Sequence, residues 1–339
     1  MPHRRKARRL VPSLVDWFSV HARDLPWRLT RDPYDIWVSE IMLQQTQVAT
    51  VIPYWERWMR ALPTLQKLAR AKPEHVLKLW EGLGYYSRAR NLQAAAKEIV
   101  KSLDGQFPHD PETIRALPGI GRYTAGAISS IAFGLPQPVV DGNVTRILTR
   151  IFGIRTNPKD KATNDYLWSL AETLVAKASD CSALNQSLME LGATVCTPQQ
   201  PTCTACPVAR CCVARRENAI PSIPAKGNHT RYEDKKIDVF IIANGDRYLV
   251  QQRPIDVVNA GFWEFPNSES GNKYSTPKNG RPFASARHSI THYRIQLNAH
   301  LIHTKHGKGT WCTLDEIRSL PFSSAHLKLL RKLPHRLDK

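Results

Sequence analysis

Four cysteines in the middle of the chain constrain its fold more than any other feature. Six of the seven cysteines fall between residues 181 and 212. Four of them have the spacing C-x6-C-x2-C-x5-C: Cys196, Cys203, Cys206 and Cys212. Thiolates packed this closely suit a tetrahedral metal ion or a cubane cluster. Zinc sites more often use two separated C-x2-C pairs, and only one is present here, so the spacing favours a 4Fe-4S cluster over zinc or spare thiols.

The remaining cysteines leave one ambiguity at this site. Cys211 is adjacent to Cys212 and could replace it as a ligand, whereas Cys181 and Cys312 are expected to be ordinary buried thiols. The seven cysteines are odd in number and mostly clustered, which argues against a secreted disulfide framework and for a reducing cytoplasm. Arg210, Arg215 and Arg216 flank the cluster, so the loop could present basic side chains to phosphates.

The net charge indicates a polyanionic partner. The 339 residues carry 48 Lys and Arg against 29 Asp and Glu, a surplus of +19. Up to Glu217 the count is 29 basic minus 19 acidic (+10), and beyond it 19 minus 10 (+9), so both parts are basic. Residues 1–11 are predicted to be a disordered basic arm. No apolar signal-peptide core follows them, and the uncharged run 123–140 contains glycines and prolines that disfavour a membrane span.

The pattern of apolar residues predicts two domains. From residue 12 to 219 they recur at helical spacing, and an uncharged helical stretch is expected from Ile41 to Trp55. Residues 220–231 contain two prolines and a glycine and are predicted to be a linker. From 232 to 339 an α+β domain is expected, with strands near 237–242, 247–251 and 293–302 and short helices at 314–320 and 326–333.

A glycine-rich turn lies between two helical stretches in the first domain. In Leu117-Pro-Gly-Ile-Gly-Arg-Tyr-Thr-Ala, Gly119 and Gly121 would permit a tight turn and close approach of main-chain N–H groups to an anion. A helix-hairpin-helix grips the DNA backbone in this way without reading sequence. The same residues would also serve a simple helix-helix connection, but the charge and the cysteine cluster favour nucleic acid.

Three segments together resemble one family. They are residues 39–48 (SEIMLQQTQV), the turn at 117–126 with 140–146 (VDGNVTR), and the four spaced cysteines. The sequence resembles the adenine DNA glycosylases of the MutY type, in the endonuclease III superfamily, strongly over residues 12–216. The resemblance implies a mainly α fold of two helical subdomains with the active site in the cleft between them. It also implies removal of adenine mispaired with 8-oxoguanine, or with G, in base excision repair.

Breaking a glycosidic bond requires protonation of the leaving base and stabilisation of positive charge on the sugar, and two carboxylates can divide this work. The candidates are Glu40 and Asp141. Burial beside an apolar helix would raise the pKa of Glu40, as suits a general acid, although a surface glutamate is the plain alternative. Asp141 could simply be a helix N-cap. The resemblance implies that Glu40 protonates adenine at N7 and that Asp141 faces the anomeric carbon.

The resemblance also assigns supporting roles. Tyr123 and Asn143 would orient the two carboxyl groups. Strand-cutting relatives carry a lysine where this chain has Tyr123, so a monofunctional enzyme is expected, although a weak lyase activity from another lysine stays open. Further residues would contact DNA or the flipped adenine: Arg28, Gln45, Tyr85 and Gln186. Trp27 and Trp37 are expected to be packing residues, and core packing is the alternative for Tyr85.

The second domain resembles the Nudix-like module of the same family, through residues 261–266 (GFWEFP). Residues 267–300 contain a single acidic residue, Glu269, so nucleotide hydrolysis is not expected. The family inspects 8-oxoguanine with a Phe-Ser-His loop, which Ile290, Thr291 and His292 match only in part. His288 is an alternative contact to the oxidised guanine. The alternative without a function is that residues 290–292 are an ordinary strand edge.

The implied partner is double-stranded DNA containing A:8-oxoguanine or A:G mispairs, bound by a monomer, with a sliding clamp or other repair proteins as further partners. Two rival functions remain: a bifunctional pyrimidine-specific lyase, which Tyr123 disfavours, and a non-enzymatic iron–sulfur DNA-binding protein, which the presence of both Glu40 and Asp141 disfavours.

Overall fold

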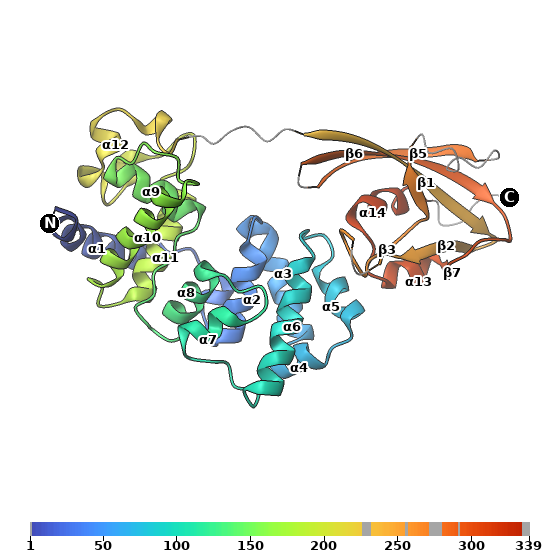
Figure 1. Ribbon diagram of the computed structural model, residues 1–339, viewed down its shortest axis with the longest axis horizontal. Helices are drawn as coiled ribbons and strands as arrows, with labels where there is room; N and C mark the ends of the chain where they lie inside the picture. The colour runs from blue at the N-terminus through green and yellow to red at the C-terminus, as the bar shows by residue number, and fades with distance from the viewer. Residues whose placement is uncertain (1, 226–231, 255–256, 271–279, 291, 334–339) are drawn as a thin grey trace. The chain divides into compact units, whose positions relative to one another are not determined.

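The computed structural model describes residues 2–225, 232–254, 257–270, 280–290 and 292–333 (Figure 1). The chain divides into two compact units. The first comprises Met1–Ala69 with Ala94–Asn228, and the second comprises Arg70–Gln93 with His229–Lys339. The sequence predicted a boundary in the linker but did not anticipate that residues 70–93 would group with the C-terminal part of the chain.

The first unit is helical. Its principal helices, with α6 shared at its start with the second unit, are α1 (Pro2–His21), α2 (Pro33–Leu43), α3 (Val48–Ala61), α4 (Leu65–Arg70), α6 (Ser87–Ser102), α7 (Pro111–Ala116), α8 (Arg122–Ile131), α9 (Gly142–Phe152), α10 (Lys161–Val175) and α11 (Cys181–Thr194). Aspartates start several of them, because a carboxylate can accept a hydrogen bond from an otherwise unpaired N–H of the first turn. Such side-chain caps occur at Asp32, Asp110, Asp141 and Asp180.

Helix α1 corrects the prediction of a disordered arm. The helix begins at Pro2, and Ala7 and Leu10 are fully buried in a core that α1 shares with α9, α10 and α11. The ammonium group of Lys6 donates to the carbonyl of Ile151 at the end of α9 (2.6 Å) and lies over the ring of Phe152. Arg5, Arg8 and Arg9 are exposed and alternate with apolar residues at helical spacing, so the high charge of this segment is compatible with a helix.

A second correction concerns the expected helix from Ile41 to Trp55. The structure interrupts this stretch after Leu43, and α3 starts at Val48. Gln45 has a left-handed backbone (φ 57°), which a continuous α-helix cannot contain. Glu40 therefore lies in the last turn of α2, next to the break between the two helices.

The second unit contains a seven-stranded mixed sheet. Five strands have the order β3 (Trp263–Glu264), β2 (Arg247–Gln252), β1 (Glu233–Asn244), β6 (Tyr293–His303) and β5 (Arg281–Ile290), while β4 (Asn267–Glu269) pairs with β1 and β7 (Thr310–Thr313) pairs with β2. Strands β1 and β6 run parallel along their length, and β5 and β6 form an antiparallel hairpin. Alternate residues of β1, Val239, Ile241 and Ala243, enter the core on one face.

Two short helices complete this sheet domain, α13 (Leu314–Ser319) and α14 (Ser324–Leu330). The expected α+β architecture is confirmed. The segment 70–93 brings α5 (Pro73–Trp80) and the following loop into the same unit. There the ring of Tyr86 packs against Phe262 with centroids 3.9 Å apart, and Lys78 and Arg90 donate to the carbonyls of Leu320 and Ala260.

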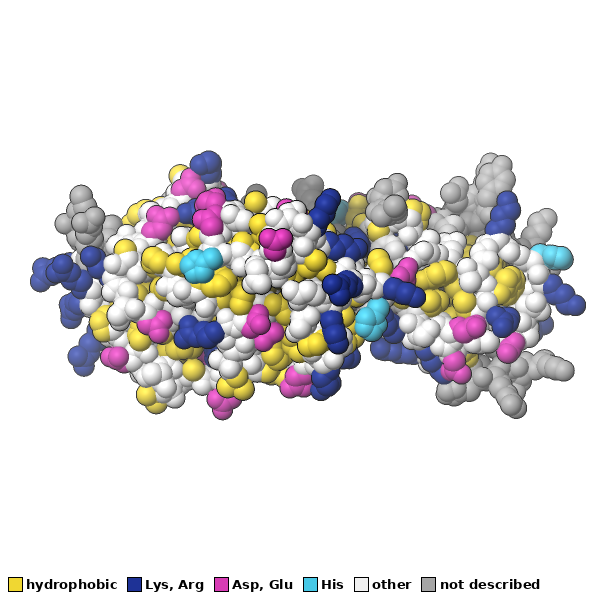
Figure 2. Space-filling view, turned by 90° about the horizontal axis from the view of Figure 1, so that it is seen from below, with side chains coloured by type: hydrophobic (Ala, Val, Ile, Leu, Met, Phe, Trp, Pro, Cys, Tyr) yellow, Lys and Arg dark blue, Asp and Glu magenta, His cyan; other side chains and the backbone are white. Residues whose placement is uncertain are grey.

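No helix among the described residues is long and apolar enough to cross a membrane. On the face shown in Figure 2, basic side chains form a group at the left end and also occur over the rest of the surface, where acidic side chains are scattered among them. The surplus of +19 is therefore a property of both units, as the count along the sequence indicated.

Removing the Leu10 side chain tests whether α1 is part of the core. We expect Leu10→Ala to lower the free energy of unfolding by about 2–5 kcal/mol, because a buried leucine leaves a cavity. Arg8→Ala, at an exposed position of the same helix, is the matched control and should change stability by less than about 0.5 kcal/mol. Equal stability of the two variants in denaturant unfolding would contradict the structure.

Candidate active site

A cavity of about 570 Å³ lies in the first unit and collects most of the predicted site residues. It is lined by the end of α2, the starts of α8 and α9, one face of α11 and the short 3-10 helix η1 (Pro26–Arg28). The predicted residues along its wall are Arg28, Glu40, Gln45, Gly121, Tyr123, Asp141, Asn143 and Gln186. Residues as far apart in sequence as Arg28 and Gln186 therefore meet at one site.

Glu40 is the buried acid of this cavity, with 5% of its surface exposed. Burial raises the pKa of Glu40 to about 7, and the nearby Asp141 adds to the increase, while the hydrogen bond from Tyr123 and the charge of Arg28 oppose it. A carboxyl group with such a pKa is present both as acid and as base near neutral pH. It can therefore deliver a proton and later accept one.

Asp141 is the N-cap of α9 and also lines the cavity, so its role as a helix cap is compatible with a role in catalysis. Its Oδ1 accepts from the backbone N–H of Val144 (2.7 Å), and its Oδ2 accepts from the side-chain amide of Asn143 (3.1 Å). Burial raises the pKa of Asp141, but these hydrogen bonds and Arg146 favour the charged form. The cap fixes the direction in which the carboxylate faces.

The hydroxyl of Tyr123 joins two walls of the cavity. It donates to Glu40 Oε2 (2.6 Å) and lies 3.2 Å from the sulfur of Met189. Burial, followed by the charge of Glu40, raises the pKa of Tyr123 well above its ordinary value, so the phenol stays protonated. No lysine lines the cavity within the described part of the chain.

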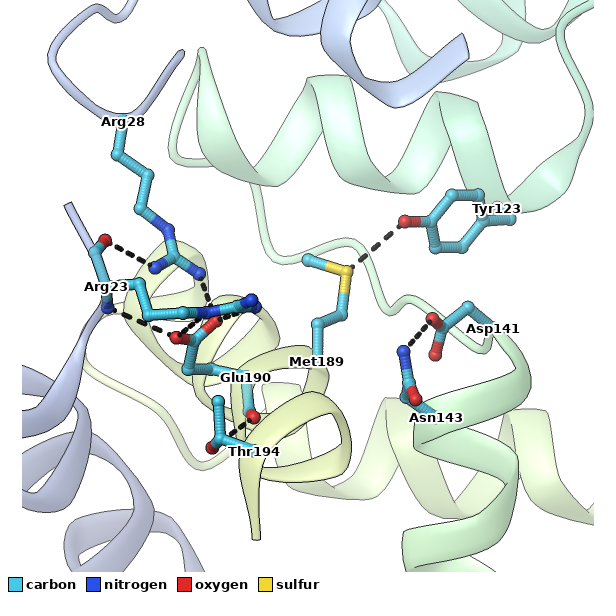
Figure 3. Close-up of polar contacts among 8 residues, drawn as sticks. All are labelled: Arg23, Arg28, Tyr123, Asp141, Asn143, Met189, Glu190 and Thr194. Atoms are coloured by element: carbon cyan, nitrogen blue, oxygen red, sulfur yellow. Dashed lines mark hydrogen bonds and ion pairs between the residues drawn. The ribbon is translucent and has the colours of Figure 1, made fainter. Parts of the chain in front are cut away.

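Helix α11 contributes residues that sequence reasoning missed. Figure 3 shows Met189 pointing to Tyr123 while Glu190, the next residue, faces two arginines. Glu190 accepts from Arg23 at 2.6 and 2.9 Å and from Arg28 at 2.8 Å. Burial tends to raise the pKa of Glu190, but the hydrogen bonds from Arg23 and Arg28 outweigh it and lower the pKa to about 2. Arg28 is thus held at the cavity wall by a permanent carboxylate.

Two arginines of α9 connect the cavity to the cysteine loop. The side chain of Arg146 donates to the carbonyl of Cys196 (2.7 Å) and to the side-chain oxygen of Asn143 (2.7 Å). Arg150, of which 2% is exposed, donates to the carbonyl of Thr197 and lies 3.3 Å from the sulfur of Cys196. The spacing of four residues places both on one face of α9, a signal present in the sequence but not used.

The four spaced cysteines line one small cavity together with Arg150 and apolar side chains, while Cys211 is absent from the described lining. Burial raises the pKa of Cys206 to about 11, and the neighbouring cysteines add to it, so four thiolates would need a positive centre among them. No three histidine, cysteine or acidic side chains in the described ranges converge tightly enough for a single metal ion. Four thiols around one small cavity are a donor set that would suit a 4Fe-4S cluster, whose ligands surround several iron atoms.

The glycine-rich turn has the form expected of a helix-hairpin-helix. It connects α7 to α8, and Gly119 has a left-handed backbone (φ 77°). Gly121 is the N-cap of α8, without a side-chain cap, and a methyl group there would stand in open space. The first N–H groups of α8 are therefore accessible to an anion such as a phosphate.

The remaining predicted contacts lie outside the cavity. Tyr85 belongs to the second unit, is 49% exposed and has a left-handed backbone (φ 46°). His292 is exposed in the turn between β5 and β6 and packs against Tyr293, whereas Thr291 lies outside the described residues. Trp37 is fully buried, whereas Trp27 is buried but also lines the cavity.

Comparisons with known proteins agree with this arrangement. The pattern of the HhH-GPD superfamily of base excision DNA repair proteins matches residues 38–173, and that of the NUDIX domain matches residues 238–332. The adenine DNA glycosylase of Buchnera aphidicola subsp. Schizaphis graminum is 33% identical over 294 residues, which is 84% of each chain. The chain belongs to the adenine DNA glycosylase family.

Other members of the family are more similar over a shorter stretch. The human adenine DNA glycosylase is 51% identical over 225 residues, covering 64% of this chain and 41% of the human protein. The chain spans less than half the length of the mammalian and plant relatives. Among solved structures, a thermostable thymine-DNA glycosylase superposes with a TM-score of 0.58 at 28% identity, covering 63% of this chain and 98% of that one.

A trapped endonuclease III–DNA complex has the same fold as the helical part, with a TM-score of 0.54 at 22% identity, covering 63% of this chain and 98% of that one. The mainly α domain followed by a Nudix-like α+β domain is thus confirmed.

The raised pKa of Glu40 predicts a pH dependence of stability. In the unfolded chain Glu40 loses its proton near pH 4.5, but in the folded protein it does so only near pH 7, so stability falls as pH rises between these values. We expect Glu40→Gln to be more stable than the wild type at pH 8, by up to about 3 kcal/mol, and to lose this advantage below pH 5. Denaturant unfolding at both pH values measures the difference, and a constant difference would contradict it.

The cysteine loop predicts which thiols are ligands. We expect Cys212→Ser to lose the visible charge-transfer absorbance of an iron–sulfur cluster and to contain less iron. Cys211→Ser, the matched neighbour, should retain both, because Cys211 does not line the cavity. The reverse pattern would show that the ligand assignment is wrong.

Proposed function

We propose that this chain is a monofunctional DNA glycosylase that hydrolyses the N-glycosidic bond of adenine mispaired with 8-oxoguanine, and of adenine opposite G, in base excision repair. The observation that carries the proposal is the pair of carboxyl groups that line one cavity: Glu40, buried and with a pKa near 7, and Asp141, half-buried and held as the N-cap of a helix. The family membership of the chain supports the choice of adenine.

In this mechanism Glu40 enters the reaction as the acid. It donates its proton to N7 of the flipped adenine, so the base leaves as a neutral molecule. Asp141, charged and oriented by Asn143, stabilises the positive charge that develops on the sugar. Glu40, now ionised, then accepts a proton from the attacking water, and the products are adenine and an abasic site.

The DNA contacts follow from charge and backbone geometry. The start of α8, the hairpin glycines and the arginines near the cysteine loop would hold phosphates, and Tyr85 and Gln45 would fill the space that the flipped base leaves. A 4Fe-4S cluster on Cys196, Cys203, Cys206 and Cys212 would hold the loop together and position its basic side chains. Ile290, Thr291 and His292 would face the oxidised guanine.

A strand-cutting lyase is the less favoured function, because its Schiff base requires an amine at the sugar. Tyr123 stands where the lyases of the superfamily carry that lysine, and the described cavity wall contains arginines but no lysine. We therefore expect no borohydride-trapped complex between this protein and a substrate duplex.

The decisive assay compares base release from duplexes with adenine opposite 8-oxoguanine, G or T. We expect release from the first two, and strand cleavage only after alkali. Glu40→Gln should slow release by roughly 10²–10⁴-fold, since a general acid contributes that much, and should retain DNA binding. Glu56→Gln, at an exposed position of α3, is the matched control and should keep the wild-type rate. Absence of release from the 8-oxoguanine pair would refute the proposal.

A further inference from the structure

The hydroxyl of Tyr123 has one proton and two acceptors. Glu40 Oε2 lies 2.6 Å from the phenol oxygen, and the sulfur of Met189 lies 3.2 Å from it. A hydroxyl group can donate only one hydrogen bond at a time. Within the described part of the chain these are the two acceptors that the Tyr123 hydroxyl contacts, so its proton must lie towards one or the other.

The ionisation state of Glu40 decides between them. An ionised Glu40 can only accept, so the phenol proton points to the carboxylate. A protonated Glu40 can itself donate from Oε2 to the phenol oxygen, and the phenol proton then needs another acceptor. A thioether sulfur is a weak acceptor, but in a buried site even a weak acceptor is preferable to an unpaired hydroxyl.

We propose that Met189 is a positioning residue that stabilises the protonated form of Glu40 by accepting the Tyr123 hydrogen bond whenever Glu40 carries its proton. The proton of Tyr123 thus turns from Met189 to Glu40 each time the acid gives up its own proton. This inference rests on the proposed function only for its consequence for the rate, because the hydrogen-bond exchange itself requires no substrate.

In the ranges that the structure describes, the charged groups around Glu40 do not accept the hydrogen bond of Tyr123. The groups that act on Glu40 come from three other elements: Tyr123 on α8, Asp141 at the start of α9 and Arg28 in η1. Glu190, beside Met189 on α11, is occupied by Arg23 and Arg28 (Figure 3). Of these groups, Asp141 favours protonated Glu40 through its charge, whereas Met189 is the group positioned to receive the displaced phenol proton.

The test is the pKa of Glu40 in the full-length, cluster-loaded protein, followed by NMR of carbon-13-labelled glutamate carboxyl groups and assigned with Glu40→Gln. We expect Met189→Leu to lower this pKa by roughly half a pH unit, the size expected for loss of one weak hydrogen bond. Met59→Leu, a partly buried methionine of α3 away from the site, is the matched control and should cause no shift.

A double-mutant cycle separates this role from packing. In a Tyr123→Phe background, which removes the shared proton, Met189→Leu should cause no further shift. An equal shift in both backgrounds, no shift in either, or an upward shift with Met189→Leu would overturn the proposal. Norleucine in place of methionine keeps the length of the side chain without the sulfur, so it must give the same lowering if Met189→Leu does not fold.

The rate of base release then tests the two inferences separately. If both hold, the alkaline limb of the single-turnover pH profile moves down with the pKa of Glu40 in Met189→Leu. A lowered pKa with an unchanged rate profile would support the hydrogen-bond exchange and contradict Glu40 as the general acid. An unchanged pKa would overturn the exchange whatever the rate.

Discussion

The first unit depends on the side-chain cap of α9. The carboxylate of Asp141 accepts from the backbone N–H of Val144, and this contact caps the first turn of the helix and sets the direction in which the carboxylate faces at the cavity wall. Arg146 and Arg150 then reach the cysteine loop from the next turns, and Lys6 of α1 binds a carbonyl at the far end. A single helix thus connects the acid site, the cysteines and the N-terminal segment.

The cavity holds, close together, one glutamate that is kept ionised and one that is kept partly protonated. Glu190 is held ionised by two arginines, whereas Glu40, on the neighbouring wall, is kept partly protonated by burial. The two glutamates have the same ordinary pKa, but their pKa values differ here because Glu190 accepts hydrogen bonds from charged arginines, whereas Glu40 accepts one from a neutral phenol. Separation of this kind is what an acid-catalysed reaction requires, because the proton donor must be neutral while its neighbours are charged.

The second unit combines a NUDIX-type fold with a stretch of sequence that is poor in acidic residues. The sheet and its two short helices match the NUDIX pattern, yet residues 267–300 hold one acidic residue, and the described part of the domain contains no group of side chains suited to a metal ion. Its buried carboxylate, Glu264, is instead bound to Arg253 inside the domain.

Much of this could be predicted from the sequence, for local reasons. Helical and strand periodicity located the two architectures, the cysteine spacing located the loop, and Asp141 before a helical stretch predicted the cap, because each of these patterns depends on residues near one another in the chain. The break after Leu43 and the order of residues 2–11 were missed, since a backbone turn at Gln45 and burial of Leu10 depend on the rest of the unit. Only the tertiary structure showed that Met189 and Glu190 line the cavity of Glu40. It also showed that Arg146 and Arg150 reach the cysteine loop. Contacts between residues so far apart in the chain leave no periodic trace, because they arise from helix packing and not from neighbouring residues.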